Sequence, residues 1–262
     1  MRSVLLWLTI AVCYQAVAND GWWASTGSVA GFGKHESIQM VEEDISIRLL
    51  AESAEVEVTF MFKNHGTATV VTMGFPEEHA GLKDAGMLGF RSWVDGVEVV
   101  THRQTKLEDE ESRHWKAVWL KDVRFDAGQS RKVRVTYKAE YGGNTSGSRR
   151  LNYTLETGAT WKGQIERCHI LVDWSGWDIG PPELRFLRTA SVKEQKWART
   201  SRHRSETVLT EVRPDYDLAV DFASAFWNFR IDGVRVADEA YYRQPVNRLD
   251  PLIGAGLPGM FF

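Results

Sequence analysis

The stretch from Ala54 to Glu77 constrains the fold of this chain more than any other. Its first half alternates between apolar and polar residues, and the apolar set comprises Val56, Val58, Phe60 and Phe62. Side chains two positions apart share one face of a β-strand. This half therefore predicts a strand with one buried face.

The second half continues the pattern after a turn. Asn64-His65-Gly66 separates the two halves, and Asn and Gly tolerate the positive φ that a tight reversal needs. The buried face of the second run comprises Thr69, Val71, Met73 and Phe75. Because proline cannot donate to a strand ladder, Pro76 is expected to end this run. The two runs predict a hairpin that packs its apolar face on another sheet.

Alternating runs separated by turn residues recur along the chain, and helical periodicity is scarce. This pattern predicts an all-β fold of two antiparallel β-sandwich domains. A Gly- and Ser-rich stretch predicts the linker between them. The expected divisions are a signal peptide at 1–18, a first sandwich at 19–141, a linker at 142–150, a second sandwich at 151–236 and an extended, irregular C-terminal tail at 237–262.

Two Asp-Gly pairs predict tight hairpin turns. Asp95-Gly96 interrupts an alternating run, and Asp232-Gly233 follows another run that ends at Ile231. A type I′ turn needs positive φ at both central residues, which is why this dipeptide favours it.

Residues 1–18 have the features of a secretory signal peptide. Arg2 gives the positive start, a short apolar core follows, and Ala16-Val17-Ala18 is a small-x-small cleavage site. We expect cleavage after Ala18 and an exported protein, periplasmic or extracellular. The alternative is a lipoprotein attached at Cys13.

The mature chain is expected to lack a transmembrane anchor, because its apolar runs are too short to span a bilayer. Signal cleavage would leave Cys168 as the only cysteine, which excludes an intramolecular disulfide and a Cys-based zinc site. Cys168 shares strand parity with Ile170, Val172 and Trp174. We expect a buried structural thiol rather than a nucleophile.

The formal net charge of −3 argues against a nucleic-acid partner, which would require a basic surface. Basic residues crowd only at Arg199, Arg202 and Arg204, which suit either a solvated turn or a phosphate site, with the turn favoured. Acidic runs at 42–44 and 108–111 suit either solvated carboxylates or calcium ligands. Consecutive carboxylates favour solvation.

Motifs for catalysis are absent from the sequence. The seven histidines show neither His-x-His nor His-Glu-x-x-His spacing. Gly-x-Ser-x-Gly and the phosphate-binding loop are also missing. We expect no enzymatic activity, no cofactor and no metal, with a site assembled from distant histidines as the alternative.

The first half of the chain resembles the vault/inter-α-trypsin (VIT) domain over about residues 40–141. The matching features are a strand ending in Asn64, the Phe75-Pro76-Glu77 box, the strand pair from Gly89 to Val99 and a closing strand from Gly128 to Tyr137. The family usually has Phe-Pro-Leu-Pro where this chain has Phe-Pro-Glu. The resemblance implies a VIT-like β-sandwich.

The whole chain is also similar to exported bacterial proteins of a family of unknown function. The shared motifs are a Tyr-x-Leu-x-x-Gly-Ala-x-Trp-Lys-Gly stretch from Tyr153 to Gly163 and a Pro-x-x-Asp-Leu motif from Pro214 to Leu218. This resemblance implies an exported β protein and names no activity.

These observations predict an exported, non-enzymatic protein that binds another protein or serves as a structural component of a bacterial cell envelope. A sandwich has no structural need for four adjacent carboxylates, so the loop carrying them is a candidate contact with a basic partner. Tryptophans in irregular stretches are candidate exposed rings. The candidate partner-binding residues are Glu108, Asp109, Glu110, Glu111, Trp22, Trp23 and Trp177. The alternatives are a carbohydrate-binding module that binds a glycan through exposed Trp residues and a cryptic envelope hydrolase.

Overall fold

The computed structural model describes residues 21–26, 29–32, 34–78, 87–105, 115–143, 148–177, 179–187, 192–193, 196–223, 230–231 and 234–235. For β1 and β2 it describes the backbone alone. The predicted signal peptide and the predicted C-terminal tail lie outside these residues. Apart from one short 3-10 helix, every regular element in the described part is a β-strand. The prediction of an all-β fold is confirmed at this level.

The largest sheet has eight strands, in the order β16-β17-β13-β3-β4-β10-β6-β7. Its pairs are antiparallel except for β13 beside β3, which is parallel. The strands are β3 (Ile38–Leu49), β4 (Ser53–Asn64), β6 (Met87–Val94), β7 (Val97–Val99), β10 (Ser130–Glu140), β13 (Ile165–Asp173), β16 (Ala198–Ser201) and β17 (Arg204–Val212).

Two five-stranded sheets accompany it. The first has the order β2-β1-β5-β9-β8. Its strands are β1 (Gly21–Thr26), β2 (Val29–Phe32), β5 (Thr69–Glu78), β8 (His102–Gln104) and β9 (Trp115–Phe125). The second has the order β11-β12-β18-β14-β15. Its strands are β11 (Gly142–Gly143), β12 (Ser148–Tyr153), β14 (Glu183–Leu187), β15 (Val192–Lys193) and β18 (Asp217–Ala223). The 3-10 helix η1 (Glu156–Thr160) follows β12, and β19 (Arg230–Ile231) pairs with β20 (Val234–Arg235).

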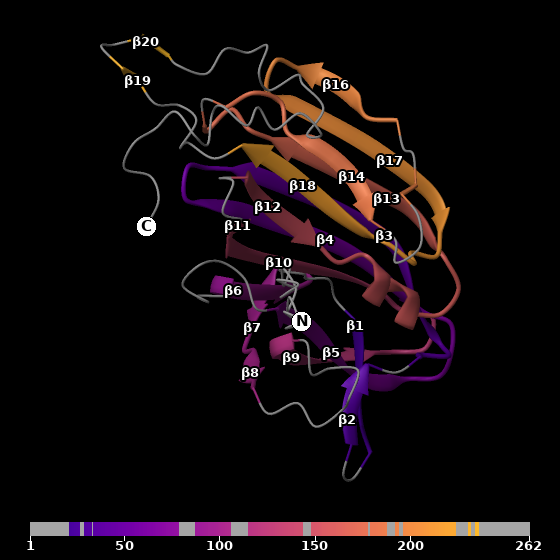
Figure 1. The fold of residues 1–262 in the computed structure, drawn as a ribbon. Helices are drawn as coiled ribbons and strands as arrows, with labels where there is room; N and C mark the ends of the chain where they lie inside the picture. Colours follow the sequence, from indigo (N-terminus) through magenta and orange to yellow (C-terminus); the bar gives the residue numbers. More distant parts are fainter. Residues whose placement is uncertain are drawn as a thin grey trace, which may run out of the picture.

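Both five-stranded sheets cover the same face of the eight-stranded sheet. In the first, the ring of Phe75 meets Phe90 of β6 at 5.3 Å and Tyr137 of β10 at 5.5 Å. In the second, the Tyr153 hydroxyl donates to the carboxylate of Glu43 on β3. Figure 1 shows β12, β18 and β14 stacked against β13, β3 and β4. A single continuous core results, because one long sheet is shared by two shorter ones.

The sequence correctly predicts the buried face of β4 but not its neighbours. Val58, Phe60 and Phe62 are fully buried, as expected. However, β4 pairs with β3 and β10, whereas β5 pairs with β1 and β9 in a different sheet. The predicted hairpin between the two runs is therefore wrong. Alternation identifies which side chains are buried, and it carries no information about which strand lies alongside.

Asn64 explains how the chain changes sheets after β4. Its side-chain amide donates to the carbonyls of Thr67 and Asp126, and its carbonyl oxygen accepts the N–H of Gly66. Asn64 is buried, so these bonds satisfy polar groups that would otherwise lose water. The turn chemistry predicted for Asn64-His65-Gly66 thus makes a corner between sheets.

Pro76 does not end β5, which continues to Glu78. Its cross-strand partner is Val118 of β9. On its other side β5 pairs with β1 at Met73 and Gly74, and among the described residues no neighbour needs the missing N–H. Proline is tolerated at such an edge position.

The arrangement as two sandwiches joined by a linker is not confirmed. Strands β13, β16 and β17 follow the predicted linker in sequence but belong to the same sheet as β3, β4 and β10. Within the linker range, Gly142 pairs with Arg150 and Gly143 with Arg149, so both ends of this range belong to one sheet. Glycine and serine mark turns as well as linkers, so composition did not distinguish the two.

Asp95-Gly96 forms the predicted tight turn. Val94 pairs with Val97, and Asp95 and Gly96 adopt φ values of 49° and 84°. Positive φ at both positions is the requirement of a type I′ turn. Near the C-terminus Ile231 pairs with Val234, as a second hairpin requires, and Asp232-Gly233 lies outside the described residues.

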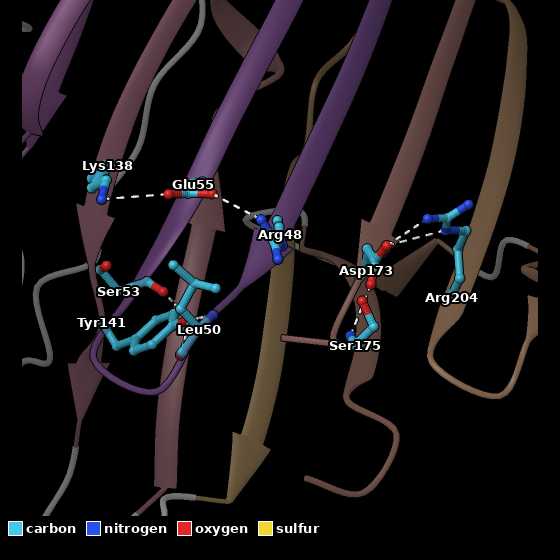
Figure 2. Close-up of polar contacts among 9 residues, drawn as sticks. All are labelled: Arg48, Leu50, Ser53, Glu55, Lys138, Tyr141, Asp173, Ser175 and Arg204. Atoms are coloured by element: carbon cyan, nitrogen blue, oxygen red, sulfur yellow. Dashed lines mark hydrogen bonds and ion pairs between the residues drawn. The ribbon is translucent and has the colours of Figure 1, made fainter. Parts of the chain in front are cut away.

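The opposite face of the eight-stranded sheet is open and carries rows of alternating charge. One row runs across five neighbouring strands as Lys138, Glu55, Arg48, Asp173 and Arg204, which are successive cross-strand partners. Figure 2 shows Glu55 between Lys138 at 3.4 Å and Arg48 at 3.5 Å. Exposed ion pairs each contribute at most about 1 kcal/mol. They keep the face soluble and help to set the strand register.

Candidate functional site

Two of the seven predicted partner-binding residues lie in the first five-stranded sheet, and four more belong to a loop that connects two of its strands. Trp22 and Trp23 lie in β1, where Trp22 pairs with Met73 of β5 and Trp23 with Phe32 of β2. Their side chains are not among the described ones. The acidic loop, defined here as residues 106–114, joins β8 to β9 and lies outside the described residues with Glu108, Asp109, Glu110 and Glu111. Strand order therefore places β1 and both ends of the acidic loop in one sheet.

The prediction that the ring of Trp177 faces solvent is wrong. Only 9% of its surface is exposed. The ring stacks on Tyr141 at 6.1 Å and meets Phe222 edge-on at 5.4 Å. The Gly-containing sequence around it correctly suggests a turn, but the turn folds back so that Trp177 closes one end of the core.

An ion pair between a buried carboxylate and a partly exposed guanidinium lies in the first five-stranded sheet. Glu77 of β5 is 1% exposed. Its Oε1 and Oε2 each accept a hydrogen bond of 2.8 Å from the guanidinium of Arg103 in β8. The indole Nε1 of Trp119 in β9 donates to Oε2, also at 2.8 Å. We call these three residues the Glu77 brace, since they tie together three adjacent strands.

The register explains why a carboxylate points inward here. Glu77 is two residues beyond Phe75 and shares its buried face. Phe75 pairs with Trp119, and Trp119 pairs with Arg103, so the guanidinium is delivered to the same side. Phe90 of β6 stacks on Trp119 at 5.0 Å and closes the brace from the facing sheet. Removing Arg103 would leave the buried carboxylate of Glu77 without its ion-pair partner, although the 31% exposure of the Arg103 side chain makes this loss smaller than in a fully buried pair.

The Glu77 brace fixes the strand ends from which two connections leave. Glu77 is the penultimate residue of β5, which is followed by residues 79–86, and Arg103 is the penultimate residue of β8, which is followed by the acidic loop. Sequence reasoning noted Phe75-Pro76-Glu77 as a departure from a family pattern and gave Glu77 no role. An acidic residue at buried parity was the signal that marked it.

A second buried polar cluster surrounds Glu43. The Tyr153 hydroxyl donates to Oε1 at 2.9 Å, and the Cys168 Sγ lies 3.7 Å from Oε2. Burial, with the charge of Glu43 adding to it, raises the pKa of the Cys168 thiol and of the Tyr153 hydroxyl well above their usual values. Cys168 is 1% exposed, which confirms the predicted burial. A protonated, enclosed thiol is a poor nucleophile.

Histidine and carboxylate side chains meet on the open face. His169 of β13 lies between Asp44 at 3.3 Å and Glu206 at 3.1 Å. Among the described residues no group of three or more His, Cys, Asp and Glu side chains is arranged to hold a metal ion. Glu42 and Asp44 point to solvent whereas Glu43 points into the core, so these three consecutive acids do not converge on one ion.

Comparison with known proteins gives a fold and no family. No protein-family model matches the chain, and no curated protein matches it. A solved structure of a candidate nutrient-binding protein from Legionella pneumophila matches with a TM-score of 0.59 and 16% identity, covering 79% of this chain and 70% of that one. At this identity the likeness shows the fold alone.

Two further matches are too weak to indicate a shared fold, because their TM-scores are low. An M1 zinc metallopeptidase from Deinococcus radiodurans matches at 0.39 with 8% identity, covering 74% of this chain and 44% of that one. A yeast LTA4 hydrolase matches at 0.41 with 8% identity, covering 70% of this chain and 28% of that one. The resemblance to VIT domains stays a prediction. In the described residues no helix is long and apolar enough to cross a membrane.

Proposed function

We propose that this chain is an exported, non-enzymatic protein of a bacterial cell envelope that binds a partner protein through the acidic loop. The observation that supports it is the Glu77 brace. A buried carboxylate with three hydrogen-bond donors ties β5, β8 and β9 together, and the acidic loop connects β8 to β9 in the sequence. Recognition loops are often carried on rigid scaffolds of this kind.

Binding agrees better than catalysis with where the reactive groups lie. Glu43 and Cys168 are enclosed in the core, and His169 pairs with carboxylates on a flat open face. A nucleophile or general base must reach its substrate. Neither arrangement offers a group that is both activated and accessible.

Glycan binding has less support from the described tryptophans. The rings of Trp115, Trp161, Trp174 and Trp177 are buried. Of the half-buried ones, Trp93 lies beneath two arginines, Trp119 is part of the Glu77 brace, and Trp197 stacks on Phe186. This alternative therefore rests on Trp22, Trp23 and Trp227, whose side chains are not described. The Legionella structure shares a fold with this chain and does not select a ligand.

In-cell crosslinking of the full chain tests the proposal. Glu108, Asp109, Glu110 and Glu111 are replaced together by Ser or Asn. We expect an unchanged melting temperature and weaker capture of specific partners, since attraction to a basic surface is lost. Capture by the wild type should also weaken with added salt.

Intact mass measurement of the same exported sample should give a chain that begins at Asn19.

A matched control removes the same number of charges elsewhere. Glu36, Glu52, Glu166 and Glu211 are exposed, and their joint replacement by Gln should leave capture intact. Equal capture by the loop variant and the wild type would show that the acidic loop is not the partner site. Loss of folding in the loop variant would show that the loop is structural.

A further inference from the structure

The hairpin of β16 and β17 forms one edge of the eight-stranded sheet. β16 is the outermost strand, and all four of its residues are exposed. Ser201 pairs with Arg204 across the two turn residues Arg202 and His203. An edge strand presents backbone N–H and C=O groups that an added strand can pair with. This edge can therefore accept an additional strand, and its side chains determine which kind of partner fits.

Arg199 carries a positive charge that is held in place at this edge. Its guanidinium lies over the ring of Trp174 at 5.5 Å and donates to the carbonyl oxygens of Ser201 and Arg202. Trp174 is itself buried, and its backbone N–H donates to the carbonyl of His203 at 2.9 Å. These acceptors are neutral carbonyls, so in the described part of the chain no carboxylate neutralises Arg199.

Of the other two arginines of the hairpin, Arg204 pairs with the carboxylate of Asp173. Arg204 donates from Nη2 to Oδ2 of Asp173 at 2.6 Å, and Ser175 N–H donates to Oδ1 at 2.8 Å (Figure 2). Burial alone would raise the pKa of Asp173, but hydrogen bonds from Ser175 and Arg204 lower it to about 2. Arg202, in the turn, is exposed. At the turn end of the hairpin Arg199, Arg202 and Arg204 stand against the one carboxylate of Asp173, so this end is net positive, whereas Glu206 and Glu211 lie further from the turn along β17.

The form of this surface favours an acidic peptide over other anions. The β16 residues Ala198, Arg199, Thr200 and Ser201 offer no large apolar side chain for a membrane, and the adjoining Trp174 is enclosed. Arg199 lies on β16 and Arg202 in the turn that follows it, so both charges lie at one end of this edge, where an acidic segment could meet them. A peptide can also pair its backbone with the strand edge, which a sugar or a phosphate cannot.

We propose that β16 accepts an extended acidic segment of a partner protein as an additional strand of the eight-stranded sheet, with carboxylates placed against Arg199 and Arg202. This surface is separate from the acidic loop and selects the opposite charge. Salt should weaken the interaction, because exposed charges drive encounter.

Fluorescence anisotropy with a labelled peptide of alternating Glu and Thr tests the proposal on the mature full-length chain. We expect saturable binding that the double variant R199Q/R202Q weakens roughly tenfold or more. The control R124Q/R213Q also removes two exposed arginines and should bind like the wild type. If R199Q disturbs packing on Trp174, R202Q alone keeps the test valid, since Arg202 forms no ion pair within the described residues.

Two further arms separate strand addition from simple charge attraction. A peptide of the same Glu/Thr sequence with N-methylated backbone amides keeps the charge but has no N–H to donate to the strand edge, and we expect it to bind far more weakly. Vesicles of phosphatidylglycerol should not compete. The proposal is overturned if both peptides bind equally, if the two double variants behave alike, or if vesicles bind instead of the peptide. A variant lacking the four loop carboxylates should bind the peptide normally. Peptide binding at β16 and partner binding by the acidic loop can therefore fail independently of each other.

Discussion

Asp217 begins β18 and caps the 3-10 helix η1. Its Oδ1 accepts the backbone N–H of Leu155 at 2.9 Å and of Glu156 at 3.3 Å. Burial, reinforced by the charge of Glu156, raises the pKa of Asp217 to about 7, against the lowering effect of these two hydrogen bonds. The folded state therefore holds this proton more tightly than the unfolded chain does.

This difference predicts a stability that falls as the pH rises from about 4 to about 7. Below that range the carboxyl is protonated in both states. Above its ordinary pKa the unfolded chain ionises first, which favours unfolding, until the folded state also loses its proton near pH 7. Allowing for solvent screening of a partly exposed group, the contribution is about 2 kcal/mol.

Urea unfolding of the wild type and D217N at pH 4 and at pH 7 measures this contribution to stability. Asn keeps the acceptor oxygen for Leu155 and Glu156 and does not titrate. The stability difference between the two proteins should change by about 2 kcal/mol with pH, whereas D126N, at an exposed turn, should run parallel to the wild type. Parallel curves for D217N would contradict the shifted pKa.

At the level of single residues the sequence predicts burial well and buried charge poorly. Phe60, Phe62 and Cys168 are buried as their parity indicates. Glu43 and Glu77 sit at buried parity too, yet a carboxylate in the core depends on donors that arrive from distant strands, Tyr153 for one and Arg103 for the other. Local alternation does not contain those partners, so the Glu77 brace was not predicted.

Among the elements, β13 joins the two halves of the chain. It pairs in parallel with β3 and antiparallel with β17, so it is a central strand of the largest sheet. The sequence predicts a strand at this position, but a parallel pair needs a long connection and leaves no local turn signal. Pairing at this sequence distance is set by the shared core rather than by neighbouring residues.

Cys168 offers a direct measure of how firmly β13 is held. Its thiol is buried against Glu43, and its backbone lies between β3 and β17. We expect labelling by a thiol reagent at neutral pH to be many-fold slower in the native chain than in urea, because a buried thiol must be exposed first. V172A, which removes buried volume from the same strand, should speed native labelling by weakening its packing.

An exposed-strand variant provides the control for this measurement. V208A changes an apolar side chain that already faces solvent on β17 and should leave the labelling rate unchanged. Rapid labelling of the native wild type would show instead that β13 opens readily and that Cys168 is accessible to reagents.

The whole molecule is expected to unfold as one unit, because its two halves share a sheet and a core. Ile45 and Ile47 of β3 lie opposite Ile170 and Val172 of β13, and all four side chains are buried. Cutting the chain at the predicted domain boundary would expose them to water. Each fully buried side chain of this kind contributes roughly 1.5–3 kcal/mol, so the loss is comparable with the stability of an ordinary domain when the contacts of Tyr153 and Trp161 are added.

Urea unfolding of the mature chain should therefore show one transition that coincides in circular dichroism and tryptophan fluorescence. A fragment of residues 19–141 should lack a cooperative transition, because the uncovered edge of β3 leaves Glu43 without Tyr153 and Phe62 without the ring of Trp161, now 4.8 Å away. Two separate transitions in the full chain, or a fragment that unfolds cooperatively, would support independent domains. Either result would mean that the parallel pairing of β3 with β13 contributes little, and that the two short sheets stabilise their own halves of the long one.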